Sequence, residues 1–142
     1  MSVLVRRGPA EYLVVSCGLW HVGLGLYFFF VRPTLLPEDL RYIGVDAQVL
    51  YAAAPRLGVW LAKVFTVVGG FMAGAGVLIA YVGWKVMPLR TRGMTAALAL
   101  TGTLTLVLMS AVNFALQSDF RWLLALPAIA WFIALGLYVR AA

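Results

Sequence analysis

The only histidine and the only cysteine of the chain lie in one apolar stretch, "SCGLWHVGLG", at residues 16–25. An imidazole can bind a metal, a haem iron or a proton, and a thiolate can bind a metal. A zinc site needs three or four protein ligands, so Cys17 and His21 alone cannot form one. A haem would need a second ligand from Met72, Met109 or another subunit. We therefore predict no metal site and no cofactor, with a haem- or metal-dependent membrane redox protein using His21 as a further alternative.

His21 lies near the centre of its apolar stretch, where a membrane span would place it at the middle of the bilayer. Gly18 and Gly25 lie three residues before and four residues after it, on the same helical face. We therefore expect His21 to point at a closely packed neighbouring helix. An ionisable residue at that depth is a candidate functional site. It either bonds a threonine hydroxyl or a backbone carbonyl in the core, or binds a ligand or a proton.

A second group of polar residues follows a helical spacing in the stretch "TGTLTLVLMSAVNFALQ". Steps of seven, three and four residues predict that its members share one face, which must point inward because an amide exposed to lipid is unfavourable. This face either bonds neighbouring helices or forms the polar wall of a cavity. Together with the histidine, the candidate ligand-binding residues are His21, Thr103, Ser110, Asn113 and Gln117.

Charged residues are concentrated around residues 32–63 and at the start of the last apolar stretch. We expect them to form ion pairs that fix the outer loop, with a binding site for a polar headgroup as the alternative. Adjacent acids such as Glu38 and Asp39 would point apart on a helix, which disfavours acid–base chemistry, and we predict no catalytic residue. The cluster comprises Glu38, Asp39, Arg41, Asp46, Arg56, Lys63, Asp119 and Arg121.

The composition is that of an integral membrane protein. The chain of 142 residues is 64% hydrophobic and 11% charged, whereas soluble domains are about 45–50% apolar and about 25% charged. A formal net charge of +6 then favours contact with anionic lipid headgroups. We expect no nucleic-acid partner, because the chain has no basic run with interleaved aromatic residues on a polar background.

Four apolar stretches are long enough to cross a hydrocarbon core about 30 Å thick. Short links between the later stretches favour antiparallel neighbours. We therefore predict an all-α fold, an antiparallel four-helix membrane bundle forming one transmembrane domain over residues 1–142. The predicted spans are 11–31, 59–84, 94–116 and 120–139, with an outer loop at 32–58.

The distribution of lysine and arginine sets the expected orientation. The link 85–93 carries three basic residues and no acid, which favours a cytoplasmic location for it and for both termini. The residues placed on the inner side are Arg6, Arg7, Lys85, Arg90, Arg92 and Arg140; those on the outer side are Arg32, Arg41, Arg56, Lys63 and Arg121.

The outer loop contains signals for two short helices. Pro37 suits a first helical position and Gly44 suits a helix stop. Asp46 suits an N-cap, and Pro55 would end the second helix. Both segments are amphipathic, so we expect them to lie on the outer surface as an interfacial lid.

Small residues form two stripes on the second span. Gly70 and Gly74 form a GxxxG motif, and the other stripe contains Gly69, Ala73, Gly76 and Ala80. Small residues let membrane helices approach closely. They would serve packing within the bundle, homodimerisation or a ligand groove. The predicted helix-packing residues are Gly18, Gly25, Gly69, Gly70, Ala73, Gly74 and Gly76.

The segments "LPEDLRYIG", "GGFMAGAG" and "VNFALQSDFRWLL" together resemble a family of small four-span proteins of bacterial inner membranes that has no assigned activity. The resemblance implies a multi-pass inner-membrane protein and assigns no functional residue.

The function expected from these features is that of a non-enzymatic membrane protein. It would be an accessory subunit, or would bind a lipid-like small molecule between the helices and the outer lid. The expected partners are membrane lipids and a partner subunit or further copies of the chain. An oligomeric small transporter or channel, with His21 and the polar face lining the path, is the alternative.

Overall fold

The computed structural model describes residues 7–141 and shows an all-helical fold over that range. The expected all-α fold is confirmed, whereas Arg6, assigned above to the inner side, lies outside the described residues. Four helices are long and apolar enough to cross a membrane, which fits a multi-pass membrane protein. They are Pro9–Phe30, Leu57–Leu89, Met94–Ala115 and Arg121–Arg140.

The first long helix has a well-defined start, and the second long helix ends in two non-α turns. Helix α1 (Pro9–Phe30) starts with proline at its first position, and the Glu11 carboxylate accepts a hydrogen bond from Gly8 N at 2.8 Å. Helix α4 (Leu57–Tyr81) continues into a π-helical turn, η1 (Val82–Val86), and a 3₁₀ turn, η2 (Met87–Leu89).

The third long helix is interrupted at its middle. Helix α5 (Met94–Gly102) passes into a π-helical turn, η3 (Thr103–Val107), before helix α6 (Leu108–Ala115). A tight link with Gln117 in the left-handed region (φ 51°) then leads to α7 (Arg121–Arg140). A π turn inserts a residue into the helical repeat, so the faces of α5 and α6 are rotated relative to one another.

Helices α1 and α4 pack backbone against backbone through small residues. A Cβ atom added at Gly18 would lie 2.6 Å from Ala80 N, and one added at Gly25 would overlap Ala73 N. The earlier residue of α1 thus meets the later residue of α4, so the two helices are antiparallel. This α1–α4 seam consists of Gly18, Gly25, Gly69, Ala73, Gly76 and Ala80.

The GxxxG motif does not contribute to this seam. Within the described chain, a Cβ added at Gly70 or Gly74 would meet no atom within 4 Å. The neighbouring Phe71 is 76% exposed. Of the two small stripes on α4, one therefore holds the helix pair together and the other faces outward.

Helix α7 is fixed to α5 by Trp131. Its side chain is 2% exposed, and Nε1 donates to the Leu98 carbonyl at 3.1 Å. The indole occupies the space that a side chain at Gly102 would need. Near the end of α7, the Tyr138 hydroxyl donates to the Met87 carbonyl at 3.1 Å.

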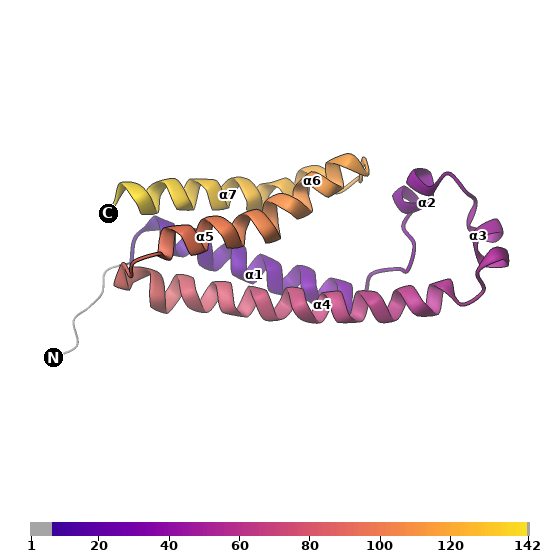
Figure 1. Cartoon of the computed structure of the whole chain (residues 1–142), viewed down its shortest axis with the longest axis horizontal. Coiled ribbons are helices and arrows are strands. Elements are labelled where there is room, and N and C mark those ends of the chain that lie inside the picture. The colour runs from indigo at the N-terminus through magenta and orange to yellow at the C-terminus, as the bar shows by residue number, and fades with distance from the viewer. Residues whose placement is uncertain (1–6, 142) are drawn as a thin grey trace.

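The four long helices pack in the order α4, α1, α7 and then α5 with η3 and α6. Figure 1 shows α6 and the start of α7 diverging from α1 towards the end of the molecule that carries α2 (Pro37–Ile43) and α3 (Ala47–Ala53). Many large apolar side chains on the outer faces of α4 and α7 are exposed, as expected for helices that contact lipid.

The two short helices of the long loop are present. Asp39 Oδ2 accepts a hydrogen bond from Leu36 N at 2.9 Å and so caps α2, which ends at Gly44 in the left-handed conformation. Asp46 caps α3 by accepting from Gln48 N at 2.7 Å. Residues of α3 are half-buried or exposed, whereas α2 contacts the end of α1 through Asp39 and the link between α6 and α7 through Glu38.

Candidate functional site

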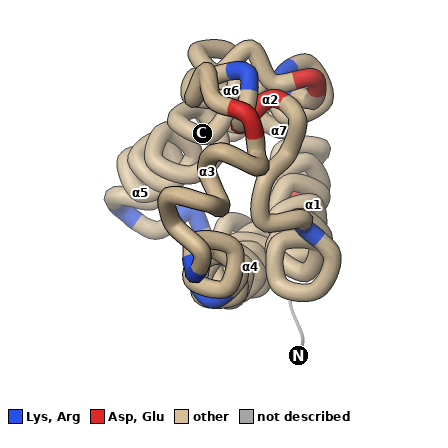
Figure 2. The backbone as a smooth tube through the Cα atoms, turned by 90° about the vertical axis from the view of Figure 1, so that its right-hand side faces the viewer, with Lys and Arg blue, Asp and Glu red and all other residues tan. Residues whose placement is uncertain are grey.

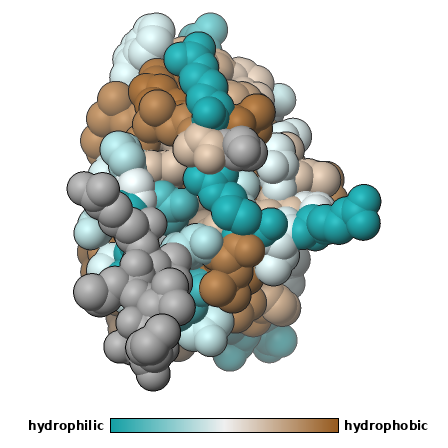
Figure 3. Space-filling model, turned by 90° about the vertical axis from the view of Figure 1, so that its left-hand side faces the viewer, coloured by the Kyte–Doolittle hydropathy of each residue, from teal (hydrophilic) through white to brown (hydrophobic). Residues whose placement is uncertain are grey.

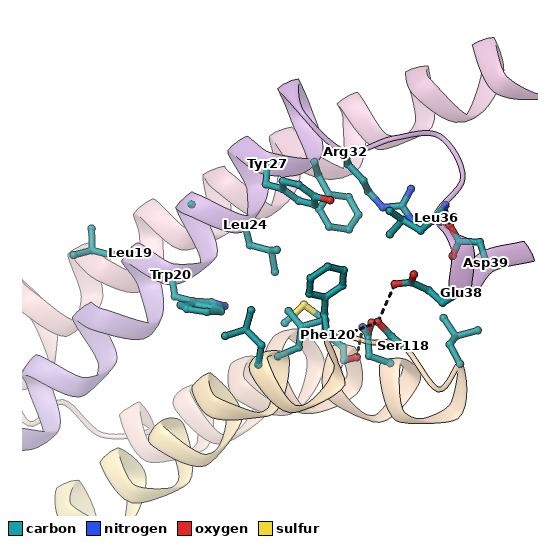
Figure 4. Close-up of a pocket in the computed structure, with 17 residues that line it drawn as sticks. Leu19, Trp20, Leu24, Tyr27, Arg32, Leu36, Glu38, Asp39, Ser118 and Phe120 are labelled. Atoms are coloured by element: carbon teal, nitrogen blue, oxygen red, sulfur yellow. Dashed lines mark hydrogen bonds and ion pairs between the residues drawn. The ribbon is translucent and has the colours of Figure 1, made fainter. Parts of the chain in front are cut away.

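A cavity of about 690 Å³ lies between α1 on one side and α6 with α7 on the other, next to α2 (Figure 4). Its volume lies within the roughly 300–1,000 Å³ typical of small-molecule sites. It forms where α6 and the start of α7 diverge from α1, so the flare of the bundle creates the space.

Most of the cavity wall is apolar and is supplied by the two diverging sides. Trp20, Leu24 and Phe28 project from α1, at successive helical turns. The opposite wall has bulky apolar side chains from α6, α7 and the link between them: Met109, Leu116, Phe120, Leu123 and Leu124. The apolar walls suit a hydrocarbon chain or ring system better than a polar metabolite.

One end of the cavity is polar because α2 brings two carboxylates to it. Arg32 Nη2 and Asp39 Oδ2 form an ion pair at 3.1 Å, with side chains only 10% and 22% exposed. The Arg32 guanidinium also lies over the Phe65 ring, 3.8 Å from its centroid. Asp39 therefore caps α2 and fixes it to the end of α1.

The second carboxylate ties α2 to the opposite wall. Ser118 Oγ donates to Glu38 Oε1 at 3.2 Å, and both residues are buried. The same hydroxyl oxygen accepts a hydrogen bond from Phe120 N at 3.2 Å. Glu38 and Asp39 thus point to different partners, as their adjacent positions on a helix predict, and α2 bridges the two sides of the cavity (Figure 4).

The predicted outer cluster is only partly brought together, as Figure 2 shows around α2. Besides the contacts of Glu38 and Asp39, Arg41 Nη2 pairs with Asp119 Oδ1 at 2.9 Å on the exposed surface. Arg121 Nη1 donates to the Ser118 carbonyl at 3.4 Å. Of the whole cluster, only Glu38 and Asp39 line the cavity. Asp46 caps α3, and Arg56 and Lys63 are exposed on the approach to α4 and on its first turns.

Of the predicted ligand-binding residues, Asn113 lines the cavity. Its Nδ2 donates to the Met109 carbonyl at 2.9 Å, and this hydrogen bond does not use the side-chain oxygen Oδ1. Ser110 is buried, and Gln117 is exposed beside the cavity in the tight link. Thr103 is exposed and donates to the Ala99 carbonyl at 2.8 Å. The π turn η3 lies between Thr103 and Asn113, so the two side chains do not share one face.

His21 lies on the buried face of α1 and is not part of the cavity wall. Its Nδ1 atom is buried and has no hydrogen-bond partner within residues 7–141. One turn earlier, the Cys17 thiol donates to the Pro127 carbonyl at 3.5 Å. Over the same range, no three metal-ligating side chains come together.

Most residues that line the cavity were not among the candidate site residues chosen from the sequence, and Trp20, Gly23 and Arg32 are the most informative of them. Trp20 Nε1 is buried and unpaired among the described residues, and Figure 4 shows the indole reaching into the cavity from α1. Arg32 follows the first span directly, and Asp39 lies seven residues later. A basic residue at the end of a span, followed by Pro33 and by an acid at the start of a short helix, is the sequence signal that could have indicated this ion pair.

Comparison of the chain with protein-family models found no match, and comparison with curated proteins and with solved structures found no significant match either. The candidate site therefore has to be interpreted from its own geometry.

Proposed function

We propose that this chain is a non-enzymatic, multi-pass protein of a bacterial inner membrane that holds a lipid-like small molecule between its helices and the α2 segment. Both termini would be cytoplasmic, and α2 would lie on the outer side. The single observation that carries the proposal is the cavity, which is apolar along its length and polar at one end. An amphiphile has the same division.

The polar end restricts the headgroup. Arg32 is neutralised by Asp39, and Glu38 adds a further carboxylate bonded to a neutral serine. A purely anionic headgroup would meet this carboxylate without an unpaired cation, so its binding is disfavoured. A neutral or zwitterionic headgroup with hydrogen-bond donors fits better, with its tail beside Leu24 and Leu123.

Trp20 supports a ligand in the same space. A buried donor without an acceptor costs about 1–3 kcal/mol, and the indole Nε1 of Trp20 is such a donor among the described residues. A carbonyl or ether oxygen of an amphiphile would satisfy it after a small movement of the ring. Tryptophan is also suited to this role because it combines a large apolar body with one polar atom.

The test fills the cavity without disturbing the helices. A Cβ at Gly23 would meet no described atom within 4 Å, and Gly23 lines the cavity. The control is Gly136→Leu on α7, where the added atom also has open space outside the cavity. Native mass spectrometry of gently extracted protein should show a bound neutral or zwitterionic amphiphile on the original chain and on Gly136→Leu, and its loss from Gly23→Leu. A bare original chain, or equal retention by both variants, would refute the proposal.

A role in an oligomer, as an accessory subunit or as part of a small transporter or channel, is supported by one observation. The outward GxxxG stripe of α4 leaves room for close approach of another helix at Gly70 and Gly74, next to the exposed Phe71. The test is the subunit mass of Gly70→Leu and Gly74→Leu in mild detergent. Loss of a higher mass seen with the original chain would support this role, and a monomeric original chain would exclude self-association.

A further inference from the structure

A second cavity lies at the opposite end of the molecule and has a different electrostatic character. Its volume is about 660 Å³, and three arginines line it: Arg7 before α1, Arg90 after η2 and Arg140 at the end of α7. These residues are far apart in the sequence and meet because three helix ends lie together there. Figure 3 shows hydrophilic side chains gathered over this end.

Two of the guanidinium groups are held in place by backbone carbonyls and aromatic rings. Arg7 Nε donates to the Trp84 carbonyl at 3.0 Å, with its guanidinium carbon 3.9 Å from the Trp84 ring centroid. Arg90 Nη1 donates to the Tyr138 carbonyl, and its guanidinium lies 4.0 Å from the Tyr138 ring centroid. Each guanidinium has five N–H donors, so most donors of both groups are left for another acceptor.

The charge of this cavity is not neutralised within residues 7–141. None of the three arginines forms an ion pair with a described carboxylate, and the ion pairs of that range lie elsewhere. Glu11 is the single acid among the lining residues, and its Oε2 accepts from Gly8 N at 2.8 Å. The site therefore carries an excess of positive charge.

The backbone of Arg90 is also constrained. It adopts a left-handed conformation (φ 53°), which is unfavourable for a residue with a side chain, so the surrounding contacts maintain its placement.

We propose that this basic cavity binds a phosphate group. Planar guanidinium groups pair with phosphate oxygens through two parallel hydrogen bonds, which makes arginine well suited to phosphate recognition. The phosphate belongs either to an anionic phospholipid headgroup, which the position at the ends of apolar helices favours, or to a soluble phosphate compound. This site shares no lining residue with the amphiphile cavity, so neither proposal depends on the other.

The experiment measures lipid and phosphate binding to matched arginine variants. Arg140→Gln is the first variant, because Arg7 and Arg90 also bond backbone carbonyls; Arg7→Gln is the second. Arg92→Gln is the control, because it removes the same charge from the link between η2 and α5, two residues after Arg90, and Arg92 does not line the cavity. Native mass spectrometry would follow one-to-one adducts with phosphatidylglycerol, phosphatidylcholine and inorganic phosphate. Thermal unfolding of each variant checks the fold.

The expected result is a preference for phosphatidylglycerol over phosphatidylcholine, which weakens roughly tenfold in Arg140→Gln, as the loss of one charge-assisted hydrogen-bond pair predicts. Arg92→Gln should bind as the original chain does. Binding of inorganic phosphate with no preference for phosphatidylglycerol, lost in the same variant, would also support the site and identify a soluble ligand. No binding of either probe, or equal losses in Arg92→Gln and Arg140→Gln, would overturn the proposal.

Discussion

Gly23 and Gly25 are two residues apart on α1, yet they face opposite kinds of space. A side chain at Gly25 would overlap the α4 backbone, whereas a side chain at Gly23 would extend into a cavity. One side of α1 is therefore closed by contact between backbones, and the other is held open by large side chains such as Trp20 and Phe28. The comparison shows that the size of the facing residues, and not overall hydropathy, determines where this bundle closes and where it leaves room.

The largest expected effect is at the α1–α4 seam. Gly25→Ala should destabilise the protein by about 3 kcal/mol or more, because a methyl group against backbone atoms forces the helices apart and overpacking of this kind is hard to relieve. Gly23→Ala should be neutral or stabilising by about 0.5–1 kcal/mol, since alanine is the better helix former. Unfolding by denaturing detergent would measure both. Equal effects of the two substitutions would contradict the assigned faces of α1.

The next effect concerns the contact between α5 and α7. Gly102→Ala should destabilise by about 2 kcal/mol, because the methyl group would displace the Trp131 indole and break its bond to the Leu98 carbonyl. The change should also shift tryptophan fluorescence, since Trp131 is almost fully buried. Gly136→Ala on α7, where an added Cβ meets no described atom, is the control. An unchanged spectrum in Gly102→Ala would argue against this packing.

The smallest effects concern the ion pairs of α2, and they sharpen the comparison between its buried and exposed contacts. Arg32→Gln should cost about 1 kcal/mol and increase protease cleavage within residues 33–57, because its partner Asp39 also caps α2. Arg41→Gln should cost less than about 0.5 kcal/mol, since both members of its pair are about 60% exposed. Limited proteolysis would rank the two variants. A larger effect of Arg41→Gln would show that the exposed pair of Arg41 with Asp119, and not the pair of Arg32 with Asp39, holds α2 in place.

The sequence contained most of the information about the fold and much less about the site. Hydropathy and the signals at Pro37, Gly44 and Asp46 were sufficient to locate the helices, because these features act locally. The two glycine stripes of α4 have similar spacing, so periodicity alone does not distinguish the packed stripe from the outward one. The equal seven-residue spacings of Gly18–Gly25 and Gly69–Gly76 were the signal that would have matched the correct pair.

The cavity was harder to predict because it depends on the relative directions of helices. His21 is a candidate site residue by its type, but the divergence of α6 from α1 places Asn113 and Arg32, and not His21, at the cavity. The π turn η3 adds a further complication. One additional residue rotates the following face by about 100°, so a helical projection drawn through Thr103 and Asn113 as one regular helix groups residues that the structure separates.

The α1–α4 seam also has a consequence for how this chain can change over evolutionary time. Each seam glycine faces the backbone of the partner helix, so no compensating change in a neighbouring side chain can make room for a larger residue. Natural variants should therefore keep Gly18, Gly25, Gly69 and Gly76 together, whereas the packing of α1 against α4 places no such constraint on Gly23 or on the outward glycines Gly70 and Gly74. The α1–α4 pair would then be inherited as one unit, on which cavities of different chemistry can be built by varying the other side of α1.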